Sequence, residues 1–591
     1  MRGLAKRWRV QPTDTEAGAA IAQTLRVSPL VGQLLVQRGI ADAEAGGRFL
    51  DPRLVDLHDP TGIPNLDRAA ARLVEAIHKQ QKIAIYGDYD VDGVTATSIL
   101  YHTLAHLCPD HPPTRYIPHR LEEGYGLNCQ AIDQLASEGH ELIVSVDCGI
   151  TACEPARRAR ELGVDLIITD HHEMADELPE AWTIVHPRLH EHPAAGISGP
   201  GYPWGELCGA GVAWKLAWAI ARTHCGSERV GESLRMLLVD LLSLAALGTV
   251  ADVVPLQDEN RTIVRYGLKR IKQTPFAGLN ALIDSANLRS ESIDAYHIGF
   301  ILGPRLNACG RMGHAARACD LLTILEGEAA MEAANFLHQE NSARQTTERR
   351  IVEQAEQIVR ERGYDDDQVR AIVLAEEGWH AGVVGIVCSR LVERFGRPVI
   401  LLNVENGQAV GSGRSIDGFD LHGALAACSE HLTKWGGHAM AAGMTVQTEQ
   451  VEAFREAMLA YALEHLPMEM LTPVITIHAE TTLEMLSIRA VEELNRLAPF
   501  GRANPRPTLL LRGVRLTQNA ESFGQSGKHL RLLIRHGRAA ARCLAWNRGE
   551  HAAQLRAGQY LDLVIHPKLN TYRGHTSVEL EILDWRNAAE A

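Results

Sequence analysis

Short apolar runs alternate with longer, helix-compatible stretches from about residue 66 onwards. Residues 82–86, 142–146 and 164–169 are rich in Ile, Val and Leu, as expected of strands that are buried on both faces. Residues 94–107 and 151–162 follow two of these runs and predict helices. Strands that alternate with helices predict a parallel sheet covered by helices on both sides, which is an α/β fold.

Three further patterns follow along the chain. Residues 328–361 contain almost no Pro or Gly and predict one long helix, although two ordinary helices with an unnoticed break fit the same composition. A second α/β pattern extends from residue 369 to about 465. After Pro473, short strands at 508–517, 529–536 and 561–567 predict a small β-barrel of the oligonucleotide-binding (OB) type.

The predicted fold class is therefore α/β, with two parallel-sheet lobes joined by a long helix and a C-terminal OB-like β-barrel. The expected domains are an N-terminal extension (1–65), a first α/β domain (66–275), a helical connector (276–365), a second α/β domain (366–468) and an OB-like nucleic-acid-binding domain (469–591). A length of 591 residues agrees with several domains.

Composition excludes several classes of protein. With 46% hydrophobic and 22% charged residues, the chain is neither disordered nor fibrous. The 11 cysteines form no Cys-x-x-Cys pair, which favours reduced thiols over disulfides or a zinc site. No apolar signal-peptide segment follows the basic start, and Asp240 and Asp252 interrupt the most apolar run, so we expect a soluble cytoplasmic protein without a membrane span.

Charge is distributed unevenly. The net charge is −14, but residues 501–591 contain 14 basic and 7 acidic side chains. A basic C-terminal domain on an acidic body indicates a polyanionic partner such as single-stranded DNA, contacted by Arg531, Arg535 and Lys568. A merely solubilising surface is the alternative.

Three carboxylates stand at alternate positions after the first predicted strand, in Asp88-Tyr89-Asp90-Val91-Asp92-Gly93. Their mutual repulsion is relieved by protonation, by solvation or by a cation. The pattern overlaps a calcium-binding EF-hand loop, but the twelfth position is Ile99 instead of Glu and a strand precedes it, so that interpretation fails. A solvated acidic turn stays open.

More acidic residues follow the other apolar runs. Asp147 comes after the second strand, Asp170-His171-His172 after the third, and Asp252 ends another long apolar run. Parallel strands bring their carboxyl ends to one edge, so these residues are expected to meet there, although a single Asp at such a place is often a helix cap. Carboxylates with one or two imidazoles suit Mg²⁺ or Mn²⁺, and two such ions about 4 Å apart hydrolyse phosphate esters.

These residues resemble, in order and spacing, the four motifs of the DHH phosphoesterase family. The resemblance implies two divalent cations, Mn²⁺ or Mg²⁺. It assigns His172 to the scissile phosphate and Asp170 to the orientation of the imidazoles. The implied metal ligands are Asp88, Asp90, Asp92, Asp147, His171 and Asp252, and which of them serves which ion is left open.

Motifs further on resemble those of the family's exonucleases that degrade single-stranded DNA from the 5′ end. The resemblance implies that the second lobe holds the 5′ terminus, through His380, Ser412, Arg414, Gly437 and His438. Arg305, Asn307 and Arg311 are expected to line the same cleft. Arg120 and Tyr125 are candidates for contacts to a phosphate and a base. Core packing of Tyr125, a surface helix for Arg305 to Arg311 and ordinary turns at the glycines are the alternatives. The chain departs from the family pattern at His186-Pro187 and at residues 501–507, where a stretch usually richer in Gly contains Arg502 and Arg506.

We therefore expect a metal-dependent 5′→3′ exonuclease that releases mononucleotides from single-stranded DNA in recombination and repair. A single-strand-binding protein and a helicase are expected partners, and we expect a monomer. The alternatives are a DHH hydrolase of short oligonucleotides or cyclic dinucleotides, and a catalytically silent replication scaffold.

Overall fold

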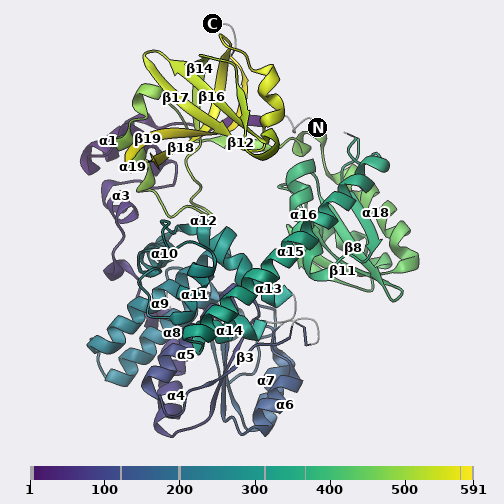
Figure 1. Cartoon of the computed structure of the whole chain (residues 1–591). Helices are drawn as coiled ribbons and strands as arrows, with labels where there is room; N and C mark the ends of the chain where they lie inside the picture. Colours follow the sequence, from purple (N-terminus) through teal and green to yellow (C-terminus); the bar gives the residue numbers. More distant parts are fainter. Residues whose placement is uncertain are drawn as a thin grey trace.

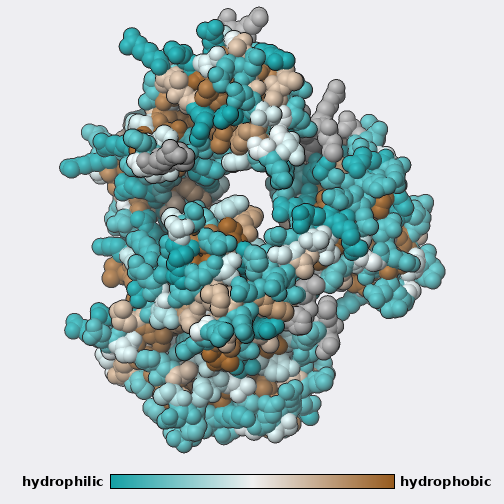
Figure 2. Space-filling model, in the orientation of Figure 1, coloured by the Kyte–Doolittle hydropathy of each residue, from teal (hydrophilic) through white to brown (hydrophobic). Residues whose placement is uncertain are grey.

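Three lobes surround a central opening in the computed structural model of the chain (Figures 1 and 2). The first α/β lobe lies at the bottom of Figure 1, the second at the right and the OB-like lobe at the top. The structure describes residues 6–119, 123–124, 126–197, 201–311, 315–366, 368–572 and 574–588.

The first lobe contains a five-stranded, fully parallel sheet in the order β3-β2-β4-β5-β6, as predicted. Alternate side chains of each strand enter two cores: Ile85 and Val144 face α4, α5, α8 and α9, whereas Tyr86 and Ile143 face α6 and α7. The elements are α4 (Leu66–His78), β2 (Ile83–Gly87), α5 (Val91–Leu107), β3 (Thr114–Tyr116), α6 (Cys129–Ser137), β4 (Leu142–Val146), α7 (Cys153–Glu161), β5 (Asp165–Thr169), β6 (Thr183–Val185), α8 (Gly209–Cys225), α9 (Glu232–Ala251) and α10 (Asp258–Arg270).

Helix α9 is long and apolar enough to cross a membrane, but 67% of its most apolar window is buried in the protein. Leu241, Leu244 and Leu247 belong to the core of the first lobe. Its apolar composition is therefore that of a core helix.

Helices connect the two α/β lobes. The connector contains α11 (Ala277–Ser285), α12 (Ala295–His297), a π-helical turn (Ile298–Leu302), α13 (Gly303–Arg311), α14 (Ala315–Thr323) and α15 (Gly327–Glu361). The 35 residues of α15 confirm the single long helix. Its first half packs in the core of the first lobe through Leu337, and its second half packs against the second lobe through Ile351 and Val359.

The second lobe differs from the prediction. Its sheet has the order β10-β11-β9-β8-β7, and only β7 and β8 are parallel. The predicted parallel sheet is wrong here because Asn406-Gly407, with φ of 51° and 78°, forms a two-residue turn that reverses the chain between β8 and β9. The elements are β7 (Ile372–Glu377), α16 (Ala381–Phe395), β8 (Val399–Glu405), β9 (Gln408–Arg414), α17 (Leu421–Ala427), β10 (Lys434–His438), β11 (Ala441–Gln447) and α18 (Val451–His465).

The C-terminal lobe is a closed ring of strands in the order β14-β18-β19-β17-β16, which the pairing of β16 with β14 completes. All neighbours in the ring are antiparallel except β17 and β19, as in an OB fold. The elements are β12 (Val474–Ile477), β13 (Ala479–Glu480), α19 (Ile488–Asn495), β14 (Leu509–Leu516), β15 (Glu521–Phe523), β16 (His529–His536), β17 (Ala539–Ala545), β18 (Tyr560–Tyr572) and β19 (His575–Asn587).

The N-terminal residues belong to this C-terminal lobe. Strand β1 (Arg7–Val10) pairs with β12. Helices α1 (Thr15–Leu25), α2 (Pro29–Val36) and α3 (Ala43–Leu50) pack on the OB core through Ile21, Leu34 and Leu50.

Arg261 of α10 connects the first lobe to the N-terminal helices and to the segment that precedes the OB ring. Its guanidinium is buried and donates hydrogen bonds to the carbonyl oxygens of Phe49 (2.8 Å), Leu497 (2.9 Å) and Ala498 (2.8 Å). One buried cation therefore satisfies acceptors from both ends of the chain.

Candidate active site

The loop after β2 places three carboxylates around the start of α5. Asp90 caps this helix, because its Oδ1 accepts hydrogen bonds from the backbone N–H groups of Asp92 (2.8 Å) and Gly93 (3.1 Å). The cap and the predicted ligand are therefore the same residue. A Cβ on Gly93 would lie 2.6 Å from the backbone nitrogen of Asp88, so only glycine permits this tight loop.

Asp92 is buried against the start of α8. Its two oxygens accept hydrogen bonds from the backbone N–H groups of Gly209 (2.6 Å) and Ala210 (2.9 Å), where the helix dipole favours negative charge. Close packing requires glycine twice: a Cβ on Gly209 would lie 2.5 Å from Cβ of Asp147, and one on Gly248 would lie 2.4 Å from Oδ1 of Asp92. We did not predict the roles of Gly209 and Ala210; the only signal for them is the small-residue run at 208–211.

His171 connects the motifs. Its Nε2 lies 3.0 Å from Oδ1 of Asp147 and 3.7 Å from carboxylate oxygens of both Asp92 and Asp252. Asp147 follows β4 with a left-handed φ of 62°, which costs a non-glycine residue conformational energy and is typical of functional sites. Asp252 reaches the cluster from the C-terminal end of α9, so the apolar run before it is a helix and not another strand of the sheet.

Asp170 and His172 form a hydrogen-bonded pair of 2.7 Å between Oδ1 and Nδ1. Burial would raise the pKa of Asp170, but the hydrogen bond and positive charge of His172 outweigh it and hold that pKa well below its ordinary value. Burial would lower the pKa of His172, but the same bond and the carboxylates of Asp170 and Asp252 raise it to about 9. The pair therefore holds a protonated imidazole whose side chain is 43% exposed.

The other carboxylates repel one another. Burial and the negative charge of Asp92 raise the pKa of Asp252 to about 8 and that of Asp147 well above its ordinary value. A carboxyl group whose pKa is raised by folding stays protonated in the folded state at pH values where the unfolded chain has lost the proton. Its contribution to the free energy of unfolding therefore falls as the pH rises from about 4 to the folded pKa. His172 acts in the same direction between pH 6.5 and about 9, because its folded pKa lies above its unfolded value.

The residues fit hard divalent cations. Potential ligand atoms lie within 4.8 Å of one another in each of three groups, and all of them are carboxylate oxygens or imidazole nitrogens. The groups are Asp88, Asp90 and Asp147; Asp92, His171 and Asp252; and Asp147, Asp170, His171 and His172. All six predicted ligands therefore meet, and cations would relieve the repulsion that raises the pKa values.

Helix α13 leads from this cluster to the second lobe. Asn307 accepts a hydrogen bond from the backbone N–H of Val91 (3.1 Å), and Arg311 donates one to the carbonyl oxygen of Gly382 (3.1 Å). Arg305 instead faces α15, where it lies 3.1 Å from Nδ1 of His338. Arg120 and Tyr125 lie outside the described residues.

The predicted residues of the second lobe gather next to Arg311. His380 caps α16, because its Nδ1 accepts a hydrogen bond from the N–H of Gly382 (3.1 Å). On β9, Ser412 and Arg414 point towards α16, since a Cβ on its Gly385 would lie 3.4 and 3.2 Å from their side chains.

The β10–β11 hairpin continues this surface. Ala441 of β11 pairs with Arg414 on one side and with His438 on the other. A Cβ on Gly437 would lie 2.4 Å from the carbonyl oxygen of Ala441, and its φ of 138° also favours glycine.

Three domains of known families match the chain: the DHH family N-terminal domain at residues 82–249, the DHHA1 domain at 368–464 and the RecJ OB domain at 477–584. The single-stranded-DNA-specific exonuclease RecJ of Bacillus subtilis is 39% identical over 98% of this chain and 70% of its own length. The chain belongs to the RecJ family.

A second RecJ protein and its crystal structure are also similar to nearly the whole chain. Thermus thermophilus RecJ is 33% identical over 98% of this chain and 78% of its own length. The crystal structure of RecJ from this organism in complex with Mn²⁺ has a TM-score of 0.81 at 30% identity, and covers 99% of this chain and 80% of that one. With its DHH and DHHA1 domains, this RecJ-family chain is a metal-dependent hydrolase.

The RecJ OB domain of this chain pairs many of its basic side chains with acids. Arg531 lies 2.7 Å from Glu521, and Lys568 forms an ion pair with Glu581. Arg535 is different, because it stands opposite Arg515 on the neighbouring strand and both are exposed. The net charge of the domain therefore overstates its free cationic surface.

Proposed function

We propose that the protein degrades single-stranded DNA from the 5′ end and releases 5′-mononucleotides by hydrolysis with two divalent cations, Mn²⁺ or Mg²⁺. The observation that carries the proposal is the buried cluster of carboxylates and imidazoles, which α13 connects to an arginine- and glycine-lined surface on a separate lobe. The names of its RecJ relatives support the substrate, and the manganese and magnesium complexes of Thermus thermophilus RecJ support the cofactor.

Six side chains would hold the cations: Asp88, Asp90, Asp92, Asp147, His171 and Asp252. Bound cations supply Lewis acidity, which activates water and neutralises charge on the phosphate. Backbone N–H groups at the starts of α5 and α8 orient the carboxylates of Asp90 and Asp92. His171 bridges the carboxylates from different elements, so the first lobe fixes the geometry of the ligands before substrate arrives.

His172 would stabilise the scissile phosphate. Because its Nδ1 proton is held by Asp170, the imidazolium can donate from its other nitrogen to a phosphate oxygen. Asp170 is itself held by the N–H of Ile150 (2.9 Å), so it acts as a positioning residue. This arrangement supports stabilisation of the negative charge that develops on the phosphate oxygens in the transition state.

The second lobe would hold the 5′ terminus. Arg414, His438 and the glycine-rich strands suit a terminal phosphate, since arginine binds it bidentately and glycine lets the backbone approach. A terminus fixed at one end of α13 places the first phosphodiester at the carboxylate cluster, which accounts for both the polarity and the release of mononucleotides. Arg120 and Tyr125 remain proposed contacts to the same strand.

The proposal also covers the cellular process, the location, the oligomeric state and the partners of the protein. We place the enzyme in DNA recombination and repair in the cytoplasm, as a monomer that works with a single-strand-binding protein and a helicase. The family resemblance supports these assignments.

Digestion of strands labelled at the 5′ or 3′ end tests the proposal. With Mn²⁺, a 5′ label on a single strand is expected to appear as mononucleotide before a 3′ label does. A blunt duplex and a reaction with EDTA are expected to show little release. Asp147→Asn keeps the size of the side chain and is expected to abolish release. Faster release of the 3′ label would refute the polarity, and faster turnover of a dinucleotide than of a long strand would favour the short-oligonucleotide hydrolase.

A further inference from the structure

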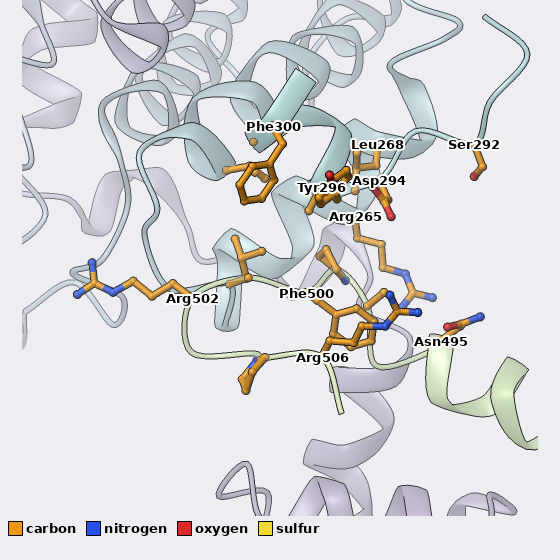
Figure 3. Close-up of a pocket in the computed structure, with 18 of the residues that line it drawn as sticks. Arg265, Leu268, Ser292, Asp294, Tyr296, Phe300, Asn495, Phe500, Arg502 and Arg506 are labelled. Carbon is orange, nitrogen blue, oxygen red and sulfur yellow. The ribbon is translucent and has the colours of Figure 1, made fainter. Parts of the chain in front are cut away.

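The loop that carries His171 and His172 follows β5 and contains neither helix nor strand. A cavity of about 1680 Å³ between the connector helices and the segment before the OB ring (Figure 3) reaches the carboxylate cluster elsewhere, at Val253. The described residues that line this cavity come from 250–300, from 492–506 and from the OB ring. Contacts within the first lobe must therefore set the position of the loop.

The backbone of His172 is held on both sides. Its N–H donates a hydrogen bond to Oδ1 of Asp170 (3.2 Å), and its carbonyl oxygen lies 2.8 Å from Nε2 of His186. His186 directly follows β6, and the last residues of β5 and β6, Thr169 and Val185, stand opposite each other. The register of the sheet therefore brings His186, whose side chain is fully buried, to the loop after β5.

The hydrogen bonds of His186 define the proton on its ring. A carbonyl oxygen can only accept, so Nε2 carries the proton that is donated to His172. Nδ1 accepts a hydrogen bond from the backbone N–H of Arg188 (3.0 Å), so this nitrogen carries none. Burial lowers the pKa of His186, which favours the same neutral ring. Both ring nitrogens are thus used to hold backbone, and neither is free for proton transfer.

His172 is fixed at two points by these contacts. Asp170 orients the ring, because its Oδ1 lies 2.7 Å from Nδ1 of His172. His186 fixes the carbonyl oxygen of His172, and with it the backbone from which the ring projects. The remaining ring nitrogen is the one that faces the phosphate in the proposed function, so a shift of this backbone moves that nitrogen.

A second histidine holds the same loop further along. Nε2 of His192 lies 2.8 Å from the carbonyl oxygen of Ala175, and its Nδ1 accepts a hydrogen bond from the N–H of Ala194 (3.2 Å). The ring of His192 is therefore used in the same way as that of His186. His192 acts on a residue beyond His172, however, which makes it a natural comparison.

We propose that His186 is a positioning residue for hydrolysis: its Nε2–H holds the carbonyl oxygen of His172 and thereby sets the place of the His172 imidazolium at the scissile phosphate. This inference rests on the proposed function, in which His172 stabilises the charge of the transition state. The neutral, buried ring of His186 acts through His172 and does not touch the substrate.

The test compares His186→Gln with His186→Met, whose side chains have the same length. Both lose the bond to Arg188, but only Gln keeps an N–H donor for the carbonyl oxygen of His172. With Mn²⁺ and a single strand, His186→Met is expected to lower kcat roughly 10- to 100-fold, since a displacement of about 1 Å can cost that much. His186→Gln is expected to keep kcat near that of the unaltered protein.

Two further measurements separate positioning from a general loosening of the fold. In His186→Met, KM and the affinity for Mn²⁺ are expected to stay unchanged, because the lost interaction acts in the transition state and His171 keeps its own contact with Asp147 (3.0 Å). His192→Met is the matched control and is expected to keep kcat.

The inference is overturned, while the proposed function stands, by any one of four results in an active protein. They are an unchanged kcat in His186→Met, an equal loss of kcat in His186→Gln, an equal loss in His192→Met, and a loss of Mn²⁺ affinity in His186→Met as large as its loss of kcat. If His186→Met does not fold, His186→Gln decides alone: a kcat near that of the unaltered protein supports the inference, and a loss of about tenfold overturns it. An unaltered protein that releases no mononucleotides from single strands refutes the proposed function itself.

Discussion

Replacing Gly248 by alanine tests whether close packing of α9 positions the carboxylate cluster. The new Cβ would lie 2.4 Å from Oδ1 of Asp92, 2.5 Å from Cβ of Ala210 and 2.7 Å from Oγ1 of Thr95, whereas ordinary contacts begin near 3.4 Å. The carboxylate and helix α9 must therefore separate by about 1 Å. Asp92 cannot yield freely, because the start of α8 holds both of its oxygens.

Two effects follow from this displacement. Overpacking a core lowers the free energy of unfolding by about 1–3 kcal/mol. For a domain of this size, each kcal/mol lowers Tm by roughly 2–4 °C. A ligand misplaced by about 1 Å is expected to lower kcat/KM on single-stranded DNA about 100-fold. Binding of Mn²⁺, measured by calorimetry, is expected to weaken as well.

Gly231→Ala is the matched control, because Gly231 precedes the same helix and a Cβ there would meet nothing within 4 Å. This control is expected to keep the activity and Tm of the unaltered protein. A folded Gly248→Ala protein with unchanged Mn²⁺ affinity and activity would refute the claim that packing of α9 sets the position of Asp92.

Three other predictions concern charge. Asp170→Asn keeps a hydrogen-bond acceptor for His172 but removes the negative charge that raises the pKa of His172. The pKa of this imidazole, measured by NMR, should fall from about 9 towards 6.5, and kcat should fall as well. An unchanged pKa would show that the charge of Asp170 is not the cause. In EDTA, Tm should fall as the pH rises from 6.5 to 8, because Asp252 and His172 stay protonated in the folded state and release these protons on unfolding. Bound Mn²⁺ should reduce this dependence of Tm on pH. Equal dependences with and without the ion would show that the carboxylate cluster is not its origin. Arg261→Met leaves buried carbonyl oxygens without a hydrogen-bond donor, at a cost of roughly 3 kcal/mol. Limited proteolysis should therefore separate the OB lobe from the first lobe sooner than in the unaltered protein. An unchanged cleavage rate would refute the role of Arg261 in holding the two lobes together.

The first lobe and most of its site follow from local patterns in the sequence. Each strand of a parallel sheet ends at the same edge, so Asp88, Asp147 and Asp170 are brought together by topology alone. The long α15 was equally predictable, because its composition contains no residue that would end it.

Other features depend on signals that were overlooked or on tertiary packing. The Asn406-Gly407 pair is a hairpin signal, yet the apolar runs beside it suggested a parallel sheet. The approach of α8 and α9 to the cluster, through Gly209 and Gly248, is a contact between helices that no local pattern encodes. The docking of the N-terminal helices on the OB ring is likewise fixed only by the shape of the assembled core.

Anomalous diffraction from a crystal soaked in Mn²⁺ tests whether carboxylates from distant parts of the chain hold a pair of divalent cations. Two peaks roughly 4 Å apart are expected, one beside Asp88, Asp90 and Asp147 and the other beside Asp92, His171 and Asp252. The absence of any peak within the first lobe, with Mn²⁺ bound only at surface carboxylates, would contradict it.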